Sequence, residues 1–100
     1  MSMEYRKLLT IVTEAALEQE LVREIERLGA HGYTVTDAHG QGRRGIRDGG
    51  WDFSANIRIE VVCTAQTARV IAAALRERYY DNYAMILFIA DVEVLRPEKF

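Results

Sequence analysis

Two strand–helix–strand patterns, joined by a glycine- and arginine-rich segment, constrain this chain more than any other feature. Each pattern contains one amphipathic helical segment, marked by apolar residues at helical spacing. In the first segment these residues are Leu17, Leu21, Ile25 and Leu28. In the second segment they are Ala68, Ile71, Ala72, Leu75 and Tyr79. Two such units fit a single split sheet with both helices on the same face.

Strand formers, capping residues and turn residues give the expected boundaries. Strands are expected at 7–12, 33–39, 55–63 and 84–95, and helices at 14–28 and 65–79. Thr13 and Thr64 are expected to cap the helices, and Gly29 to end the first one. The charged residues of 18–27 are expected to form a solvated helix face. We predict an α+β fold of the ferredoxin-like βαββαβ type, a four-stranded antiparallel sheet with two helices on one face.

The strand at 55–63 has two different faces. Residues 57, 59, 61 and 63 are apolar, whereas Asn56, Arg58, Glu60 and Val62 are mixed. Because both helices are expected on the apolar side, the mixed face must meet solvent or a partner subunit. Arg58 has two interpretations: an ion pair with a carboxylate on the same face, or a contact to a bound ligand. A homo-oligomer is expected on this ground.

Length, charge and cysteine content exclude several classes of protein. One hundred residues without a linker or repeat predict one domain, 1–100. A net charge of −2 argues against a nucleic-acid binder. No apolar run approaches the ~20 residues of a membrane-spanning helix, so no membrane insertion is expected. A single cysteine, Cys63, inside an apolar strand and the lack of a signal-peptide pattern indicate a cytoplasmic protein.

The segment 39–53 is the strongest candidate for function. It holds five of the seven glycines and three of the eleven arginines of the chain, Arg43, Arg44 and Arg47. Glycine backbone N–H groups and arginine side chains suit an anion such as a phosphate or a carboxylate. Trp51 and Phe53, at its far end, are expected to pack on the domain or on a partner protein. A solvated loop without a ligand is the alternative.

Motifs for catalysis are missing from the sequence. His31 and His39 accompany no nucleophile, and the spacing of a zinc site is absent. The Gly40-Gln41-Gly42 run lacks the last glycine of a dinucleotide fingerprint and opens no helix. We therefore expect neither an enzyme nor a metal site.

Two runs of residues resemble the PII signalling proteins. Residues 32–43 (GYTVTDAHGQGR) resemble the segment that leads from their second strand into the T-loop, and residues 58–62 (RIEVV) resemble their third strand. The resemblance extends over about residues 7–96. It implies a homotrimer that binds adenine nucleotides in clefts between subunits. It also implies a T-loop, here at about 40–54, that contacts a target protein.

The resemblance assigns roles to individual residues. The implied nucleotide-binding residues are Thr34, Gly40, Gly42, Arg43, Arg44, Val62, Asn82 and Tyr83. The candidates for binding an anion such as bicarbonate are Gly42, Arg43, Arg47 and Arg58. The implied contacts to a target protein are Ile46, Trp51 and Phe53.

Departures from the nitrogen-regulatory pattern indicate a subgroup. The T-loop is short and has no tyrosine between 40 and 54, and Asn56 replaces a lysine. Asp81-Asn82-Tyr83 stands where the family has a glycine-lysine loop. These features resemble the PII-like proteins of inorganic-carbon uptake, which are associated with carboxysomes or bicarbonate transporters. ADP and AMP are the expected ligands, with ATP and bicarbonate as further candidates. A small ferredoxin-like enzyme and a structural trimer without nucleotide are the alternatives.

Overall fold

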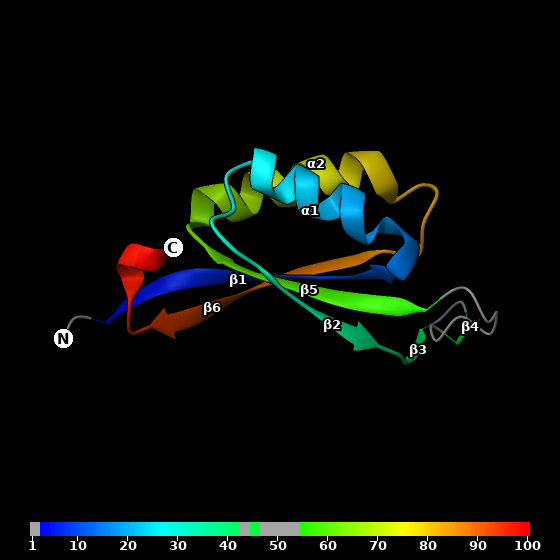
Figure 1. Ribbon diagram of the computed structural model, residues 1–100, viewed down its shortest axis with the longest axis horizontal. Coiled ribbons are helices and arrows are strands. Elements are labelled where there is room, and N and C mark those ends of the chain that lie inside the picture. The colour runs from blue at the N-terminus through cyan, green and yellow to red at the C-terminus, as the bar shows by residue number, and fades with distance from the viewer. Residues whose placement is uncertain (1–2, 43–44, 47–54) are drawn as a thin grey trace.

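The computed structural model describes residues 3–42, 45–46 and 55–100, and it shows one antiparallel sheet covered by two helices (Figure 1). Four strands form this sheet in the order β2-β5-β1-β6. Their bounds are β1 Glu4–Glu14, β2 Thr34–Ala38, β5 Asn56–Cys63 and β6 Ile86–Val94. The helices are α1 (Glu18–Arg27) and α2 (Ala65–Tyr79), with 3-10 turns at η1 (Ala15–Leu17) and η2 (Pro97–Lys99). The predicted ferredoxin-like fold is confirmed.

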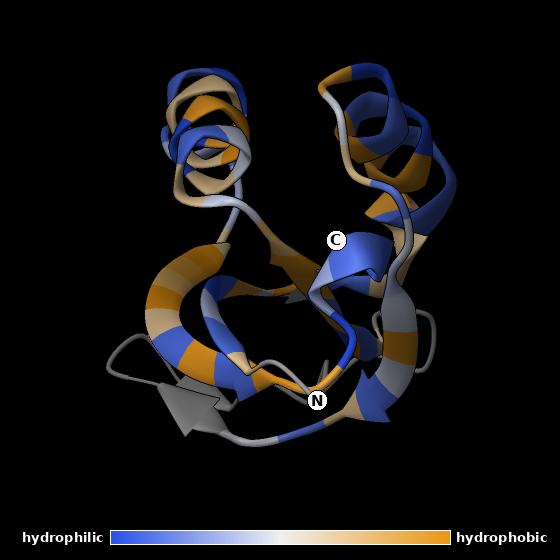
Figure 2. Cartoon of the chain, turned by 90° about the vertical axis from the view of Figure 1, so that its left-hand side faces the viewer, coloured by the Kyte–Doolittle hydropathy of each residue, from blue (hydrophilic) through white to orange (hydrophobic). Residues whose placement is uncertain are grey.

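The core lies between the sheet and the helices. The predicted apolar face of β5 points into it, and Ile57, Ile59 and Val61 are at most 2% exposed. Leu21 and Ile25 of α1 and Ile71 and Leu75 of α2 close the core from above. Figure 2 shows the two helices side by side on the same face of the sheet. The helix periodicity read from the sequence therefore identifies the buried residues correctly.

The expected start of the first helix is wrong. Thr13 and Glu14 do not cap a helix but continue β1, where they pair with Ile57 and Asn56 of β5. Strand β5 offers strand-pairing partners to Thr13 and Glu14 that a helix starting at these residues would not use. Thr13 is also completely buried. The helical path begins only after Glu14, where the Ala15 N–H donates to the Ala55 carbonyl at 2.7 Å.

The other helix signals are confirmed. Thr64 caps α2, because its side chain accepts a hydrogen bond from the Thr67 N–H. Gly29 ends the first helix with a φ of 116°, a backbone conformation that favours glycine.

Cys63 is buried as expected, and burial raises the pKa of its thiol. An unionised, buried thiol has low reactivity.

The second face of the sheet carries no helix. Strand alternation places Leu8, Thr10 and Val12 of β1 on it, together with Ile86 and Phe88 of β6 through the β1–β6 register. Phe88 and Ile86 are 53% and 45% exposed. We call this side the open face; it also carries Arg58, Glu60 and Val62, as the alternation of β5 predicted. An apolar strand surface of this kind is a typical association surface.

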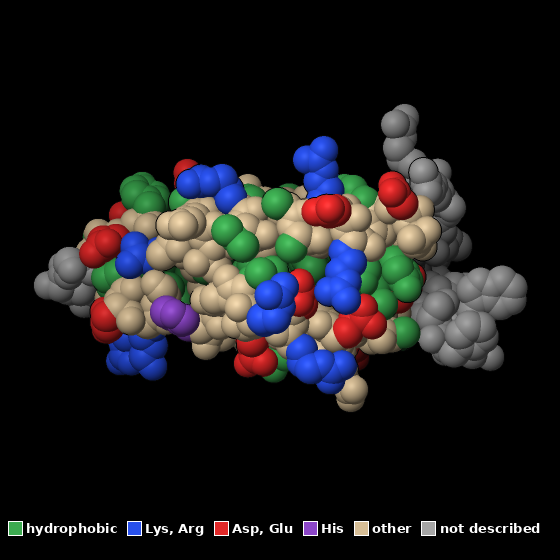
Figure 3. All heavy atoms as spheres, turned by 90° about the horizontal axis from the view of Figure 1, so that it is seen from above, with side chains coloured by type: hydrophobic (Ala, Val, Ile, Leu, Met, Phe, Trp, Pro, Cys, Tyr) green, Lys and Arg blue, Asp and Glu red, His purple; other side chains and the backbone are tan. Residues whose placement is uncertain are grey.

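The helix-covered side differs in character. Basic and acidic side chains are interspersed there, and neither charge forms a continuous patch in this view (Figure 3). No helix within the described ranges is long and apolar enough to cross a membrane. Among the same residues, no group of three His, Cys, Asp or Glu side chains is placed to hold a metal ion.

Candidate functional site

The predicted site residues fall into two groups at opposite ends of the sheet. Thr34 begins β2, and the strand runs to Ala38 at the other end. Four residues of strand span ~13 Å at a rise of about 3.3 Å per residue, and Gly40 lies farther along the chain. One protomer therefore does not bring Thr34 and Gly40 together.

The first group consists of Thr34 and Val62. Thr34 pairs with Glu60 of β5, so Val62 is its diagonal neighbour on the open face. Diagonal neighbours across antiparallel strands have Cα atoms about 7–8 Å apart. Thr34 is exposed and Val62 is half-buried. They form an accessible edge, one side chain polar and the other apolar, at the end of the sheet where β1 begins.

The second group lies at the opposite end. Ala38, Asn56 and Glu14 form one row across β2, β5 and β1, and the T-loop leaves the sheet just after this row. The loop 80–85, between α2 and β6, projects from the same end (Figure 1). It leaves from the opposite edge, three strand spacings or ~14 Å away at about 4.8 Å per spacing. Asn82 and Tyr83 thus share an end of the molecule with Gly40.

The base of the T-loop forms a short hairpin that the sequence did not predict. Gln41–Gly42 (β3) pairs with Gly45–Ile46 (β4) in a separate antiparallel ladder. At Gly40 an added Cβ would have no neighbour within 4 Å, and the backbone has no left-handed φ. Local structure therefore does not require glycine at this position. The open backbone leaves room for a ligand to approach closely.

Several predicted residues lie outside the described part of the chain. They are the arginines Arg43, Arg44 and Arg47 and the aromatic residues Trp51 and Phe53. Ile46 is described through its backbone pairing with Gln41. The role of these residues in binding an anion or a target protein stays a prediction.

The loop 80–85 has a defined internal structure. The Tyr79 carbonyl accepts hydrogen bonds from the N–H groups of Asn82, at 3.1 Å, and Tyr83, at 3.0 Å. The Tyr80 hydroxyl accepts a hydrogen bond from the Leu87 N–H at 3.2 Å. Asp81 and Asn82 are exposed, and Tyr83 is 39% exposed. The sequence 80–85 (YDNYAM) contains no cationic side chain.

Arg58 lies in the middle of the open face, between Val12 and Thr36 of the neighbouring strands. Its Nε atom is 3.9 Å from Glu60 Oε2, and its side chain is 49% exposed. An exposed ion pair at this distance contributes little to stability. Arg58 therefore forms the ion pair of the first interpretation, but this ion pair is weak. The Arg58 guanidinium is still accessible to an anion.

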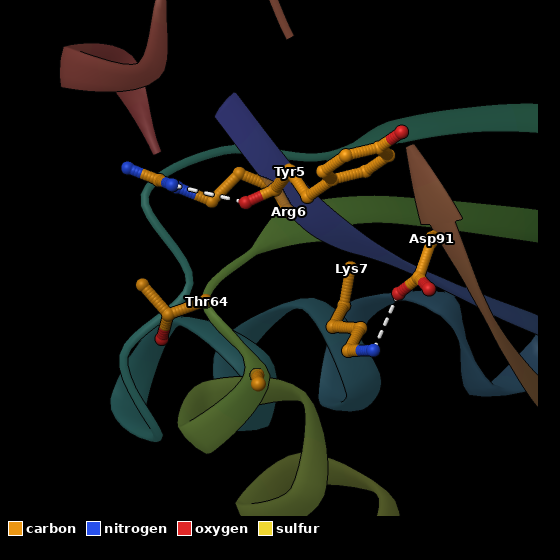
Figure 4. A pocket seen from close by; sticks show the side chains of 6 residues that line it. Tyr5, Arg6, Lys7, Thr64 and Asp91 are labelled. Carbon is orange, nitrogen blue, oxygen red and sulfur yellow. Dashed lines mark hydrogen bonds and ion pairs between the residues drawn. The ribbon is translucent and has the colours of Figure 1, made fainter. Parts of the chain in front are cut away.

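A hollow of about 390 Å³ lies at the end where β1 begins (Figure 4). Its lining residues are Tyr5, Arg6, Lys7, Thr64, Ala65 and Asp91. Lys7 and Asp91 form an ion pair on one side of it. Arg6 donates to the carbonyl oxygens of Pro97 at 3.1 Å and Phe100 at 3.4 Å, which fastens η2 to β1. No sequence pattern predicts this hollow, since its residues come from three separate elements with no common motif.

The nitrogen regulatory protein P-II family matches residues 6–99. The chain belongs to the PII family. The match covers almost the whole domain. A PII-family chain is a signalling protein and not an enzyme, so the small-enzyme alternative is not supported. PII proteins form homotrimers and bind adenine nucleotides.

Solved structures agree with this membership. A PII-like signalling protein from Thermus thermophilus is 44% identical, covers 100% of this chain and 99% of its own length, and has a TM-score of 0.86. CPII from Thiomonas intermedia, solved with ADP, AMP and bicarbonate, is 24% identical, with coverages of 99% and 96% and a TM-score of 0.88. B. subtilis GlnK, solved with ATP, is 16% identical, with coverages of 96% and 96% and a TM-score of 0.69. The last two share the PII fold with this chain.

Proposed function

We propose that this PII-family protein is a homotrimeric sensor of adenine nucleotides, with each binding cleft built from two subunits. The separation of Thr34 and Val62 from Gly40 and Gly42 carries the proposal. Within one protomer the two groups lie at opposite ends of the sheet, more than ~13 Å apart along the direction of β2. A cleft that uses both groups needs one end of the sheet from each of two copies.

The open face supports the association of copies. Phe88 and Ile86 expose large apolar side chains on a strand surface that no helix covers. Their burial against other copies removes apolar area from water, at about 25 cal/mol per Å². In a trimer like that of the family, the open face of one copy would pack against other copies of the same chain.

The ligand should lie with its base and its phosphates at different subunits. Val62 and Thr34 offer an apolar surface and a hydroxyl for the adenine. Gly40, Gly42, Arg43 and Arg44 of the other subunit offer backbone N–H groups and guanidinium groups for the phosphates. Arg43→Ala should weaken ADP binding by about 1.5–3 kcal/mol, as expected for a lost hydrogen bond to a charged group.

The loop 80–85 favours ligands with few phosphates. It faces the same end as the T-loop base but contributes a carboxylate, Asp81, and no cation. Each phosphate added to a nucleotide brings negative charge that needs a positive partner. ADP and AMP are therefore the preferred ligands in this proposal, and ATP should bind more weakly.

The proposal also includes bicarbonate as a second ligand and a regulatory role in inorganic-carbon uptake or carboxysome function. Thiomonas intermedia CPII was solved with bicarbonate beside the adenine nucleotides. Gly42, Arg43, Arg47 and the accessible Arg58 are the residues that could hold this anion here. Ile46, Trp51 and Phe53 would then present an apolar T-loop surface to a target protein, controlled by the ligand state.

A ligand panel tests the proposal. We would measure the melting temperature of the full chain with AMP, ADP, ATP and cyclic AMP, each with and without bicarbonate, and its mass by light scattering. A trimeric mass, a rise in melting temperature with ADP and AMP, and a smaller rise with ATP are expected. Arg43→Ala should remove most of the rise, while Arg69→Ala, an exposed arginine on α2, should keep it. A trimer that no nucleotide stabilises would instead be a structural trimer.

A further inference from the structure

The two helices are joined at the end of α2, directly before the loop 80–85. The Tyr79 hydroxyl donates to Glu20 Oε2 at 2.5 Å, joining the end of α2 to the first turn of α1. Tyr79 is 3% exposed. Glu20 is exposed, as expected for the solvated helix face, and its carboxylate also binds the Tyr79 hydroxyl. The signal was not visible in the sequence, since the two residues are 59 positions apart.

Tyr79 is also the anchor of the loop. Its ring meets the ring of Tyr83 edge-on, with centroids 5.6 Å apart and an interplanar angle of 61°. Its carbonyl accepts both loop hydrogen bonds, from Asn82 and Tyr83. The Tyr79 side chain and carbonyl thus hold the two loop residues, Asn82 and Tyr83, to which the PII resemblance assigns nucleotide binding.

The neighbouring acidic residue of α1 does not share this role. Glu24 is paired with Arg27, at 2.8 Å, and with Arg78, at 3.6 Å. The hydrogen bond from Arg27 is the main reason that the pKa of Glu24 lies below its usual value. Among the described residues, Glu20 is therefore the carboxylate that holds the Tyr79 hydroxyl.

We propose that Glu20 is a positioning residue for the nucleotide site, acting through Tyr79 on Asn82 and Tyr83. This inference rests on the proposed function and deepens it, because it names a control point on α1 that touches no ligand. With the Tyr79 hydroxyl held, its ring and carbonyl keep the loop in one arrangement. Without that hydrogen bond the loop samples more conformations, and a ligand must supply the free energy that orders it.

Two measurements on the full chain test the proposal. Calorimetry gives the Kd for ADP, and hydrogen exchange followed by mass spectrometry gives the protection of loop 80–85. Tyr79→Phe removes only the hydroxyl, and Glu20→Ala removes the acceptor together with its charge and most of the side chain. Both should raise the Kd by about three- to ten-fold, the range of one lost hydrogen bond, and speed exchange at Asn82 and Tyr83. Glu20→Gln keeps an acceptor oxygen and should stay within about two-fold of the parent, since one neutral hydrogen bond replaces a charged one.

The control is Glu26→Ala, on the same helix and exposed. It should change neither the Kd nor the exchange of the loop. A general loss of stability would speed exchange in α1 and α2 as well, and would show as a lower melting temperature. Unchanged loop exchange in Tyr79→Phe overturns the positioning role, as does faster exchange with an unchanged Kd. If the parent protein binds no adenine nucleotide, the proposed function fails, and loop exchange alone then decides whether Glu20 positions the loop.

Discussion

The Thr64 hydroxyl oxygen accepts a hydrogen bond from the Thr67 N–H at 3.2 Å, and α2 starts from this contact. Thr64→Ala should lower the free energy of unfolding by about 1 kcal/mol, because it leaves a helix N–H without its partner. Thr64→Ser keeps the hydroxyl and should remain close to the parent. Urea unfolding measures both. Equal losses in the two variants would assign the effect to the lost methyl group.

Gly29 should tolerate no side chain, whereas Gly32 should. A Cβ at Gly29 would meet Thr67 at an ordinary 3.7 Å, so the cost of Gly29→Ala comes from its φ of 116°. We expect a destabilisation of about 1–3 kcal/mol, the usual cost of a strained backbone. Gly32 has open space around it and no left-handed φ, so Gly32→Ala should change stability by less than about 0.5 kcal/mol. Thermal unfolding of both variants compares them, and a Gly29→Ala variant as stable as the parent contradicts the strain argument.

Tyr79 should make the protein sensitive to alkaline pH. Burial, followed by the hydrogen bond to Glu20, raises the pKa of Tyr79 from 10.0 to about 12. A pKa raised by folding gives stability that is complete below pH ~10 and is lost as the pH rises through ~12, roughly 2–3 kcal/mol at 1.36 kcal/mol per unit. The stability advantage of the parent over Tyr79→Phe should shrink across this window. Denaturant unfolding at pH 8 to 12 measures it, and a constant difference would refute the assignment.

Phe88 should hold copies of the chain together. Phe88→Glu places a charge on the open face and should give a smaller particle in light scattering, because burying an unpaired charge costs several kcal/mol. Val70→Glu is the matched control: Val70 is 43% exposed on α2, away from the open face. It should leave the mass unchanged. Dissociation by Val70→Glu with an intact Phe88→Glu oligomer would place the interface on the helices.

Gly40 should be needed for binding rather than for folding. Since its surroundings are open and its φ is not left-handed, Gly40→Val should preserve the melting temperature of the free protein. A branched side chain there would block the close approach of a phosphate to the backbone. We expect at least about a ten-fold loss in ADP affinity, or ~1.4 kcal/mol. An unchanged affinity would remove Gly40 from the site.

The sequence predicts local structure well where one signal acts alone. The stripes on α1 and α2 and the alternation of β5 identify the core correctly, because burial dominates those positions. The signal fails at Thr13 and Glu14, where capping propensity competes with strand pairing to Ile57 and Asn56. Tertiary pairing of this kind is not encoded in neighbouring residues.

The site was predictable in part, and for a similar reason. The glycines and arginines of 39–53 stand out by composition, and the PII resemblance names the rest. The division of the site between two ends of the sheet depends on the direction and register of β2 and β5. The hydrogen bond between Glu20 and Tyr79 depends on how α1 and α2 lie side by side. Neither relationship leaves a pattern in the linear sequence.

The separation of Thr34, at the start of β2, from Gly40, beyond its end, has a consequence for mixed assemblies. In the proposed ring, each cleft takes its phosphate-binding loop from one copy and its adenine surface from the next. A Gly40→Val copy still offers an intact adenine surface, and a Thr34→Arg copy still offers an intact loop. Either variant alone would be inactive, but every ring that contains both would regain one working cleft. Two loss-of-function alleles of this small protein should therefore complement each other when they are expressed together.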